Sequence, residues 1–362
     1  MNKTSIIYIA GHRGLVGSAI IEALRRKGYS NLITRSHAEL DLTNQQEVGA
    51  FFEKEKPEYV FLAAAKVGGI MANNTMRAQF IYENIQIQNN VIHSAWETGV
   101  KKLLFLGSSC IYPRLAPQPL KEEYLLTSEL EYTNEPYAIA KIAGIKMCES
   151  YNLQYGTNFL AVMPTNLYGF NDNFHLHKSH VLPAMIRKMY LAKCLEKGDL
   201  IAIRQDLRKH PMEDIRYDAE EDRIRKYLEL NGISINNGAS KLTLWGSGKP
   251  MREFLWAEDM ADACVFIMED VEFKNLINDK KGEVRNTHIN IGSGKEISIG
   301  DLALLIKEIV GFEGMIEFDA TKPDGTPRKL LDVTKLNKLG WKSTTGLAEG
   351  INKVYTHYLA EQ

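Results

Sequence analysis

The sequence predicts an α/β fold with a doubly wound parallel sheet and a smaller C-terminal α/β lobe. A β-branched run at Ser5–Ala10 leads directly into a glycine turn and then into a helix-forming segment, which is the order of a dinucleotide-binding unit. Strand-like apolar runs then alternate with helical segments. The pattern loosens near residue 169, so we expect a Rossmann-type domain over residues 1–169, to which later segments can return, and a substrate-binding lobe over 170–362.

The glycine turn at Gly11–Gly17 precedes a helix expected over Ser18–Lys27. Its glycines allow the backbone to approach a pyrophosphate, which the positive end of the helix then stabilises. The spacing is Gly-x-x-Gly-x-x-Gly rather than the commoner Gly-x-Gly-x-x-Gly. A turn that binds nothing would contain the same glycines, but the flanking strand and helix favour a dinucleotide site.

The second strand, expected over Asn31–Thr34, lacks the acidic end residue that binds the ribose 2′-hydroxyl of NAD. Arg35 follows the strand, and Arg13 lies in the glycine turn. Guanidinium groups hold a 2′-phosphate with charge-assisted, often bidentate hydrogen bonds. These residues therefore predict NADP(H) as the cofactor, unless both arginines are simply solvated on the surface. We expect Asp41 and Leu42 to line the adenine pocket.

The remaining elements alternate as a doubly wound sheet requires. In the first domain, helices are expected over Gln45–Glu55, Ala78–Thr98 and Pro136–Tyr155, and strands over Tyr59–Ala63, Lys102–Gly107 and Phe159–Met163. In the second half, helices are expected over His180–Lys197, Asp214–Leu230, Ala257–Met268 and Ile299–Val310, and strands over Lys241–Trp245, Thr287–Ile291 and Met315–Phe318. The segments 164–169 and 246–254 are interpreted as loops.

A tyrosine and a lysine share one face of the helix that Pro136 opens, because Tyr137 and Lys141 are four residues apart. A neighbouring ammonium lowers the pKa of a phenol, so the pair suits proton donation to a carbonyl that accepts hydride. Ser108, at the end of the fourth strand, would hydrogen-bond the same oxygen, and Lys141 would also hold the nicotinamide ribose. An isolated pair of this kind is usually a surface feature, but with the glycine turn it indicates a reductase.

Cys110 lies two residues after Ser108, so in extended backbone the two side chains would point to the same face. The thiol is either a buried packing residue or a base, since its ordinary pKa of about 8.5 is easily lowered by a cationic neighbour. His180 is the best partner for it, although a histidine close to His175 and His177 is usually structural. The residues alone leave both roles open.

Composition argues against several classes of function. The chain has 362 residues, of which 44% are hydrophobic and 25% charged, and its net charge is −1, which disfavours nucleic acid or an anionic membrane as a partner. Its four cysteines form no Cys-x-x-Cys pair, so we expect neither a metal site nor a disulfide framework. We see neither a signal peptide nor an apolar run of the ~20 residues that a membrane span needs. We therefore expect a cytoplasmic protein.

Several motifs resemble those of a known family. They are Ala10–Gly17, Ala63–Gly69, Gly107–Pro113, Asn134–Ser150, Met163–Gly169 and Trp245–Phe254, with similarity extending to Asp324–Lys329. Together they make the chain similar to the GDP-L-fucose synthase family, the 3,5-epimerase/4-reductases among the extended short-chain dehydrogenases/reductases. The resemblance implies conversion of GDP-4-keto-6-deoxy-D-mannose to GDP-L-fucose, by epimerisation at C3 and C5 and then NADPH-dependent reduction at C4.

The resemblance also implies roles for individual residues. Cys110 and His180 would form the acid–base pair of the epimerisation. Ser108, Tyr137 and Lys141 would serve the reduction. The residues that would hold the GDP-sugar are Lys188, Trp245, Arg252, Asp324 and Lys329. The residues expected to contact the cofactor are Gly11, His12, Arg13, Gly14, Leu15, Val16, Gly17, Arg35, Asp41, Leu42, Leu106, Gly107, Ser108, Ser109, Lys141, Pro164, Thr165, Asn166, Leu167 and His180.

Family members pair as dimers through the helices expected over Ala78–Thr98 and Pro136–Tyr155, so a homodimer is implied. Two features depart from the family. Residues 196–240 form a longer segment than usual, which is either a surface excursion or a change to the sugar pocket that admits another GDP-4-keto sugar, such as a heptose. His37 stands where a basic cofactor contact is common. The alternatives are therefore a related GDP-4-keto-sugar 4-reductase or epimerase, and a catalytically silent NADP-binding regulator.

Overall fold

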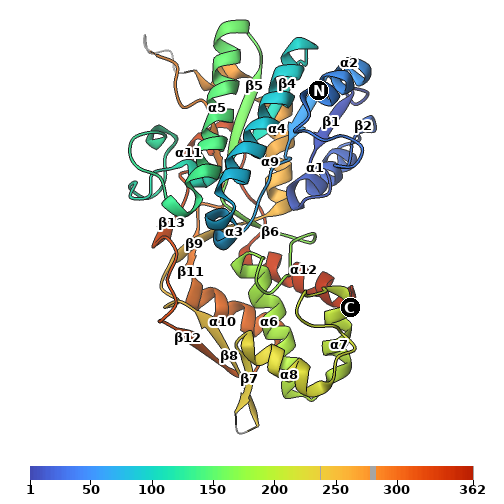
Figure 1. The fold of residues 1–362 in the computed structure, drawn as a ribbon. Helices are drawn as coiled ribbons and strands as arrows, with labels where there is room; N and C mark the ends of the chain where they lie inside the picture. Colours follow the sequence, from blue (N-terminus) through green and yellow to red (C-terminus); the bar gives the residue numbers. More distant parts are fainter. Residues whose placement is uncertain (237, 278–282, 362) are drawn as a thin grey trace. The chain divides into compact units, whose positions relative to one another are not determined.

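The computed structural model describes residues 1–236, 238–277 and 283–361 (Figure 1). The chain divides into two compact units, each assembled from three stretches. Unit 1 comprises Met1–Leu167, Glu253–Lys295 and Leu330–Thr344. Unit 2 comprises Tyr168–Arg252, Glu296–Lys329 and Thr345–Gln362.

Unit 1 is built on a parallel sheet of six strands in the order β10-β5-β4-β3-β1-β2 (Figure 1). The strands are β1 (Ile7–Ala10), β2 (Leu32–Ile33), β3 (Tyr59–Leu62), β4 (Lys102–Leu106), β5 (Phe159–Pro164) and β10 (Ile289–Ile291). The strand order reverses at β1, which pairs with β2 on one side and β3 on the other. At such a point the carboxyl ends of the strands border a ligand crevice. The predicted fold class is confirmed.

Both faces of this sheet are apolar, as the uninterrupted β-branched runs predict. Ile7 and Ile9 belong to the core on one face, whereas Tyr8 and Ala10 belong to the core on the other. The first face packs against α1 (Leu15–Arg26) and α9 (Ala257–Asp270), and the second against α2 (Gln45–Glu55), α4 (Arg77–Glu97) and α5 (Glu135–Tyr155). Each large apolar side chain buried here contributes about 1.5–3 kcal/mol to stability.

Short elements were the main errors of prediction. The two segments interpreted as loops contain strands β6 (Asn166–Tyr168) and β9 (Met251–Trp256). Strand β6 has only three residues, and β9 has two charged residues followed by an apolar run, so neither shows the alternation by which strands are recognised. Several other elements were also not predicted from the sequence: helices α3 (Ile70–Thr75), α11 (Thr334–Leu339) and α12 (Leu347–Ala360), strands β7 (Ile233–Asn236), β11 (Glu296–Ser298) and β13 (Arg328–Lys329), and the 3₁₀ turns Ser109–Ile111, Glu122–Tyr124, Tyr132–Asn134 and Phe273–Leu276.

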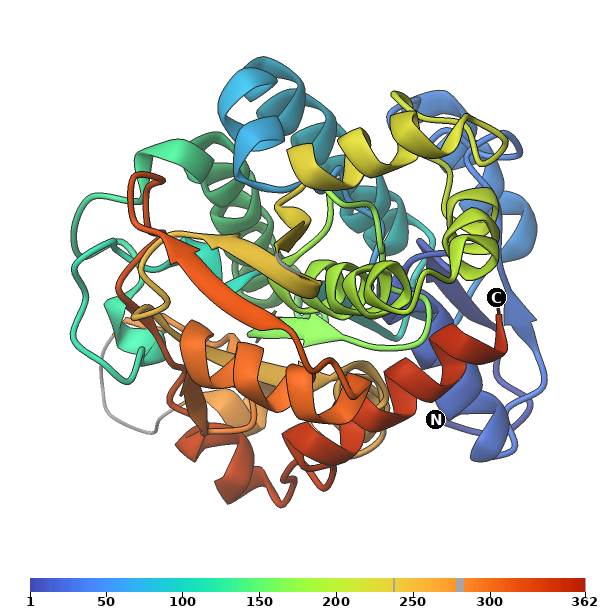
Figure 2. The same cartoon turned by 90° about the horizontal axis from the view of Figure 1, so that it is seen from below.

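Unit 2 contains a small sheet of β7 (Ile233–Asn236), β8 (Ala239–Trp245) and β12 (Met315–Asp319), in the order β12-β8-β7. Helix α6 (Val181–Glu196) packs against β7 and β8, and α10 (Ile299–Val310) packs against α6 and α12 (Leu347–Ala360), as Figure 2 shows from below. The short strands β11 (Glu296–Ser298) and β13 (Arg328–Lys329) complete the unit.

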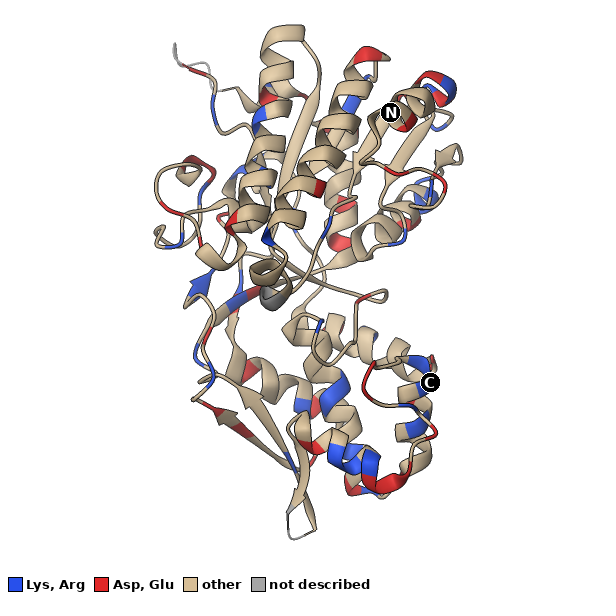
Figure 3. Cartoon of the chain, viewed as in Figure 1, with Lys and Arg blue, Asp and Glu red and all other residues tan. Residues whose placement is uncertain are grey.

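The segment 196–240 contains more helix than predicted. It forms two helices, α7 (Leu200–Lys209) and α8 (Glu221–Leu230), where a single helix over Asp214–Leu230 was expected. Acidic and basic residues are interspersed along both helices (Figure 3). The apolar positions are therefore hard to recognise in the sequence as one face of a helix. Several of these positions are nevertheless buried, including Ile203 on α7 and Ile224 on α8.

A buried ion pair ties this segment to the interior of unit 2. The Nε of Arg187, whose side chain is 0% exposed, lies 2.9 Å from both carboxylate oxygens of Asp206. Its Nη1 and Nη2 donate to the carbonyl oxygens of Phe174 at 3.0 Å and His210 at 2.7 Å. The Tyr358 hydroxyl donates to Asp206 at 2.8 Å. This buried charge pair therefore anchors α7 to the interior of unit 2, although most side chains of α7 and α8 are not buried.

Within the described parts of the chain, no helix is long and apolar enough to cross a membrane. The same residues contain no group of three His, Cys, Asp or Glu side chains that is placed to hold a metal ion.

Candidate active site

The glycine turn at the carboxyl end of β1 has the geometry of a pyrophosphate cradle. Gly11 has a φ of +86°, and a Cβ atom there would lie 2.6 Å from the backbone nitrogen of Ala64. A Cβ on Gly17 would lie 2.1 Å from the carbonyl oxygen of Gly11. Helix α1 starts after Gly14, which has no side chain to cap it, so the first N–H groups can bind a phosphate. These features fit a dinucleotide.

The two arginines predicted to bind the 2′-phosphate differ in their surroundings. Arg35 donates to a carboxylate oxygen of Glu55 at 2.6 Å, and its guanidinium lies 5.5 Å from the ring centroid of Phe51. Arg13 is exposed in the glycine turn. Because Glu55 competes with a phosphate for Arg35, we expect Arg13 to contribute more to NADP(H) binding.

Arg13→Ala should therefore weaken NADPH binding by tenfold or more, which corresponds to about 1.4 kcal/mol. NADH, which lacks the 2′-phosphate, should bind almost as before, and Arg35→Ala should show a smaller effect of the same sign. Fluorescence titration of both cofactors provides the comparison. Equal losses for NADPH and NADH would contradict the assignment.

Asp41 and Leu42, predicted to line the adenine pocket, lie in a loop of unit 1. The carboxylate of Asp41 accepts hydrogen bonds from the backbone N–H and the hydroxyl of Thr43 at 2.9 and 2.8 Å. His37 Nδ1 lies 3.7 Å from the same carboxylate, so this histidine is turned toward Asp41. Leu42 packs against the sheet core.

Tyr137 and Lys141 lie on α5, at the edge of the sheet where the strands end. Lys141 is 3% exposed, and its Nζ donates to the carbonyl oxygen of Leu106, the last residue of β4, at 2.8 Å. The same Nζ lies 5.7 Å from the ring centroid of Tyr137. The hydrogen bond from Lys141 to β4 therefore holds the first turns of α5 at the edge of the sheet where the cofactor is expected to bind.

The predicted shift of the tyrosine pKa is wrong in sign. Burial raises the pKa of Tyr137 well above its ordinary value, since the loss of hydration outweighs any effect of the nearby ammonium. Burial also lowers the pKa of Lys141 to about 8, and a thiolate at Cys110 would oppose that shift. At neutral pH, Tyr137 is therefore a protonated phenol, which is the form that can donate a proton.

The Lys141 pKa leads to a pH prediction. Its ammonium form is present below about pH 8 and is lost as the pH rises through that value. The kcat/KM for carbonyl reduction should therefore fall above about pH 8. Lys141→Arg, which stays charged, should lack this alkaline decline in whatever activity it retains. An unchanged kcat/KM up to pH ~10, near the ordinary lysine pKa, would contradict the role of Lys141.

The sequence predicted extended backbone from Ser108 to Cys110, but only Ser108 is extended and Cys110 lies in a turn. Ser109–Ile111 form a single 3₁₀ turn, and the Ser108 hydroxyl oxygen accepts a hydrogen bond from the Cys110 N–H at 3.4 Å. Serine caps this turn by bonding the backbone, which competes with an extended conformation. Cys110 is 7% exposed. A charge on it would raise the pKa values of both Tyr137 and Lys141, so these three groups lie within electrostatic reach of one another.

The other predicted cofactor contacts of unit 1 follow the ends of β4 and β5. A Cβ on Gly107 would lie 2.3 Å from the methyl carbon of Met163, so a larger residue would push the end of the Met163 side chain aside. The Thr165 hydroxyl and the Asn166 amide both donate to the carbonyl oxygen of Glu253, at 3.3 and 2.8 Å. These bonds fix the backbone just beyond β5, where Leu167 also packs against the core.

The predicted sugar-binding residues and His180 lie in unit 2. His180 occupies the N-cap position of α6, where its side chain makes no capping hydrogen bond. The residue is exposed, yet partial burial of its ring and, to a smaller extent, the Lys329 ammonium lower the pKa of His180. Lys329 of β13 pairs in register with Arg252, so two cationic side chains come from adjacent positions. Burial lowers the pKa of Lys188 on α6.

Trp245 is the last residue of β8, and Asp324 lies in the loop between β12 and β13. The Trp245 side chain is 69% exposed, and the Lys322 ammonium lies 5.6 Å from its ring centroid. The Asp324 carboxylate accepts hydrogen bonds from the backbone N–H and the hydroxyl of Ser247, at 2.8 and 2.6 Å. Asp324 therefore fixes the turn after Trp245. Ser247 lies within the Trp245–Phe254 motif but was not singled out there, and Lys322 lies outside the motifs quoted above.

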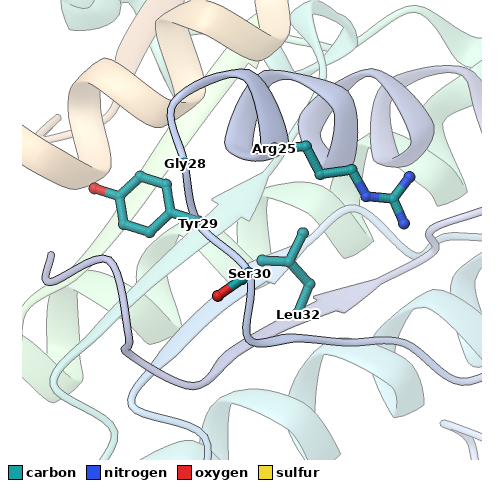
Figure 4. A pocket seen from close by; sticks show the side chains of 5 residues that line it. All are labelled: Arg25, Gly28, Tyr29, Ser30 and Leu32. Carbon is teal, nitrogen blue, oxygen red and sulfur yellow. The ribbon is translucent and has the colours of Figure 1, made fainter.

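A cavity of about 410 Å³ lies elsewhere in unit 1, lined by Arg25, Gly28, Tyr29, Ser30 and Leu32 (Figure 4). It adjoins the turn from α1 to β2, at the edge where the strands begin, so it is separate from the predicted cofactor site. The Tyr29 hydroxyl donates to Glu269 at 2.6 Å.

Comparisons with known proteins agree with this geometry. The model of the NAD dependent epimerase/dehydratase family matches residues 7–207 and 219–292. GDP-L-fucose synthase 1 of Arabidopsis thaliana is 51% identical over 358 residues, covering 99% of this chain and 94% of that protein. GDP-L-fucose synthase of Escherichia coli (strain K12) is 46% identical over 356 residues, covering 98% and 97%. A GDP-mannoheptose C4 reductase from Campylobacter jejuni, solved with NADP bound, is 46% identical with a TM-score of 0.87, covering 99% of each chain.

Proposed function

The chain belongs to the NAD dependent epimerase/dehydratase family, and from this premise we propose that it converts GDP-4-keto-6-deoxy-D-mannose to GDP-L-fucose. The reaction is an epimerisation at C3 and C5 followed by reduction at C4 with NADPH. The identity of 46–51% to GDP-L-fucose synthases over nearly the whole chain supports this function. The observation that carries it is the packing of the 3₁₀ turn that contains Cys110 against α5, the helix that contains Tyr137 and Lys141.

The reduction requires a proton for the oxygen on C4. When bound, NADPH supplies the hydride. Ser108 hydrogen-bonds the carbonyl oxygen, and Tyr137, protonated at neutral pH, donates its proton to that oxygen. The ammonium of Lys141 stabilises the resulting phenolate and binds the ribose.

The epimerisation requires proton exchange on both faces of the sugar. The 4-keto group makes the hydrogens on C3 and C5 acidic, because the electron pair left by each proton delocalises onto the carbonyl oxygen. One group removes a proton from one face and another returns a proton to the opposite face. We assign these tasks to Cys110 and His180. The lowered pKa of His180 keeps its ring neutral, in the state that can accept a proton.

The nucleotide part of the substrate is assigned to unit 2. Arg252 and Lys329, adjacent on β9 and β13, suit the pyrophosphate, and Lys188 adds a third cation on α6. The exposed ring of Trp245 suits stacking on guanine, and Asp324 fixes the turn that follows Trp245. Unit 1 binds NADP(H), and unit 2 binds the GDP-sugar.

The assembly and location also belong to this proposal. Tyr82 on α4 and Ile139, Leu153 and Tyr155 on α5 are exposed. An apolar surface on two adjacent helices suits pairing with a second copy of the chain, so we propose a homodimer through α4 and α5. We place the enzyme in the cytoplasm, where nucleotide sugars are substrates.

A related GDP-4-keto-heptose is the second candidate substrate. The observation that favours it is the similarity to the Campylobacter jejuni heptose reductase, which is as extensive as the similarity to the Escherichia coli synthase. The segment 196–240, which is longer than usual in the family, belongs to unit 2, as do the residues assigned to the GDP-sugar.

Incubation of the protein with NADPH and GDP-4-keto-6-deoxy-D-mannose tests the proposed function. We expect one NADPH to be oxidised for each sugar consumed, and NMR should identify GDP-L-fucose. A parallel incubation with a GDP-4-keto-heptose tests the alternative. Absence of NADPH oxidation with either sugar would indicate a silent binder, and a product with unchanged C3 and C5 would indicate a simple 4-reductase.

A further inference from the structure

The side chain of Tyr112 attaches the turn that contains Cys110 to the interior of unit 1. Tyr112, immediately after the 3₁₀ turn, is 4% exposed. Its hydroxyl donates to the side-chain oxygen of Asn290 at 2.5 Å and lies 3.1 Å from Nε2 of His288. Because the phenol gives its one proton to Asn290, the Nε2–H of His288 donates to the phenol oxygen.

Asn290, on β10, is a rigid support for this phenol. Its amide nitrogen donates to the carbonyl oxygens of Leu120 at 2.9 Å and Asp332 at 3.2 Å. Its backbone N–H donates to Glu122 at 3.1 Å. The side-chain oxygen and both amide hydrogens are thus engaged, so Asn290 cannot rotate without breaking several buried hydrogen bonds.

A second contact extends this support. The Lys335 ammonium donates to the carbonyl oxygens of His288 and Asn286, each at 2.9 Å, and lies 3.9 Å from Glu122. Glu122 belongs to the same loop as Cys110, further along the chain. The loop between β4 and α5 is therefore attached to β10 at two places, through Tyr112 and through Glu122.

We propose that Tyr112 is a positioning residue, which holds the Cys110 turn in the orientation needed for proton exchange. A cysteine has one rotatable side-chain bond, so the place of its sulfur is set mainly by its backbone. That backbone is fixed by the Ser108 cap on one side and by the Tyr112 phenol on the other. Tyr137 and Lys141 are held separately by α5.

This inference deepens the proposed function and rests on it for the role of Cys110. It predicts a selective defect. Loss of the Tyr112 hydroxyl should impair proton exchange at C3 and C5, while NADPH binding and the geometry of α5 remain as they are.

Tyr112→Phe keeps the buried ring and removes only the hydroxyl. Tyr29→Phe is the matched control, because that tyrosine is also buried in unit 1 and donates a comparable hydrogen bond, at the other edge of the sheet. The measurement is solvent deuterium entering C3 and C5 of GDP-4-keto-6-deoxy-D-mannose without NADPH. We expect at least a tenfold slower exchange for Tyr112→Phe, less than a twofold change for Tyr29→Phe, and unchanged NADPH affinity for both.

A second readout needs no substrate, so it separates failure of this inference from failure of the proposed function. Alkylation of each cysteine in the native protein by iodoacetamide is followed by mass spectrometry. Tyr112→Phe should accelerate labelling of Cys110 at least fivefold and leave Cys148 unaffected, whereas Tyr29→Phe should change neither. Unchanged labelling of Cys110, or equal loss of deuterium exchange in both variants, would overturn the positioning role. A wild-type protein that exchanges no deuterium would instead refute the proposed function.

Discussion

Replacement of Tyr137 by phenylalanine should lower NADPH-dependent turnover by about 10²–10⁴-fold, the range for loss of a general acid. The phenol is buried and protonated at neutral pH, and its ring lies edge-on to Phe80, 6.3 Å between centroids. Phenylalanine keeps that packing and cannot donate a proton. NADPH oxidation under saturating substrate measures the loss, and fluorescence titration should show that NADPH still binds.

The matched control for this variant is Tyr151→Phe. Tyr151 lies on the same helix, and its hydroxyl is hydrogen-bonded to His93 at 2.8 Å, more than three turns from Tyr137. Loss of the Tyr151 hydroxyl should leave turnover within about twofold, because it contacts His93 and no residue assigned to the reaction, and phenylalanine keeps the ring packing. Deuterium exchange at C3 and C5 should persist in Tyr137→Phe, because the epimerisation uses other groups. Unchanged turnover in Tyr137→Phe would remove this residue from the mechanism.

Replacement of Cys110 by serine should stop solvent deuterium from entering C3 and C5. A serine hydroxyl is a far weaker acid than a thiol, whose ordinary pKa is about 8.5, so it cannot exchange protons with the sugar at a useful rate. We expect a loss of at least about 10²-fold, comparable to removal of other acid–base groups. NMR of the recovered sugar measures the exchange at each carbon separately.

Cys194→Ser is the matched control, because it tests whether replacing any buried cysteine by serine lowers the exchange. Cys194 is buried in unit 2 and interacts with the Tyr190 hydroxyl, a contact that a serine can keep. Normal exchange in this variant and lost exchange in Cys110→Ser would assign the effect to position 110. Normal incorporation at both carbons in Cys110→Ser would contradict the assignment, and loss at only one carbon would show which one the thiol serves.

The main strands and helices of unit 1 could be predicted from the sequence, because interactions between residues close together in the chain determine them. Strand β1 and helix α2 have the periodicity of buried elements, and the glycine turn between β1 and α1 has backbone demands that only glycine meets. The four-residue spacing of Tyr137 and Lys141 placed both on α5. Each of these inferences uses residues that are neighbours along the chain.

Features that depend on a side-chain cap, on burial or on distant residues were missed. The Ser108 cap turned an expected extended segment into a 3₁₀ turn, and burial reversed the expected pKa shift of Tyr137. The helix α7 is held by a buried pair between Arg187 and Asp206, which a charged, weakly periodic sequence does not reveal. Tyr112 and Asn290 are 178 positions apart, so no local pattern connects them.

One measurement tests the central claim, that a single enzyme first exchanges protons beside a ketone and then reduces that ketone. The protein is incubated in D₂O with unlabelled NADPH and GDP-4-keto-6-deoxy-D-mannose, and the product is examined by NMR. We predict GDP-L-fucose with deuterium at C3 and C5 and protium from NADPH at C4. A reduced sugar that retains protium and its original configuration at C3 and C5 would contradict the account.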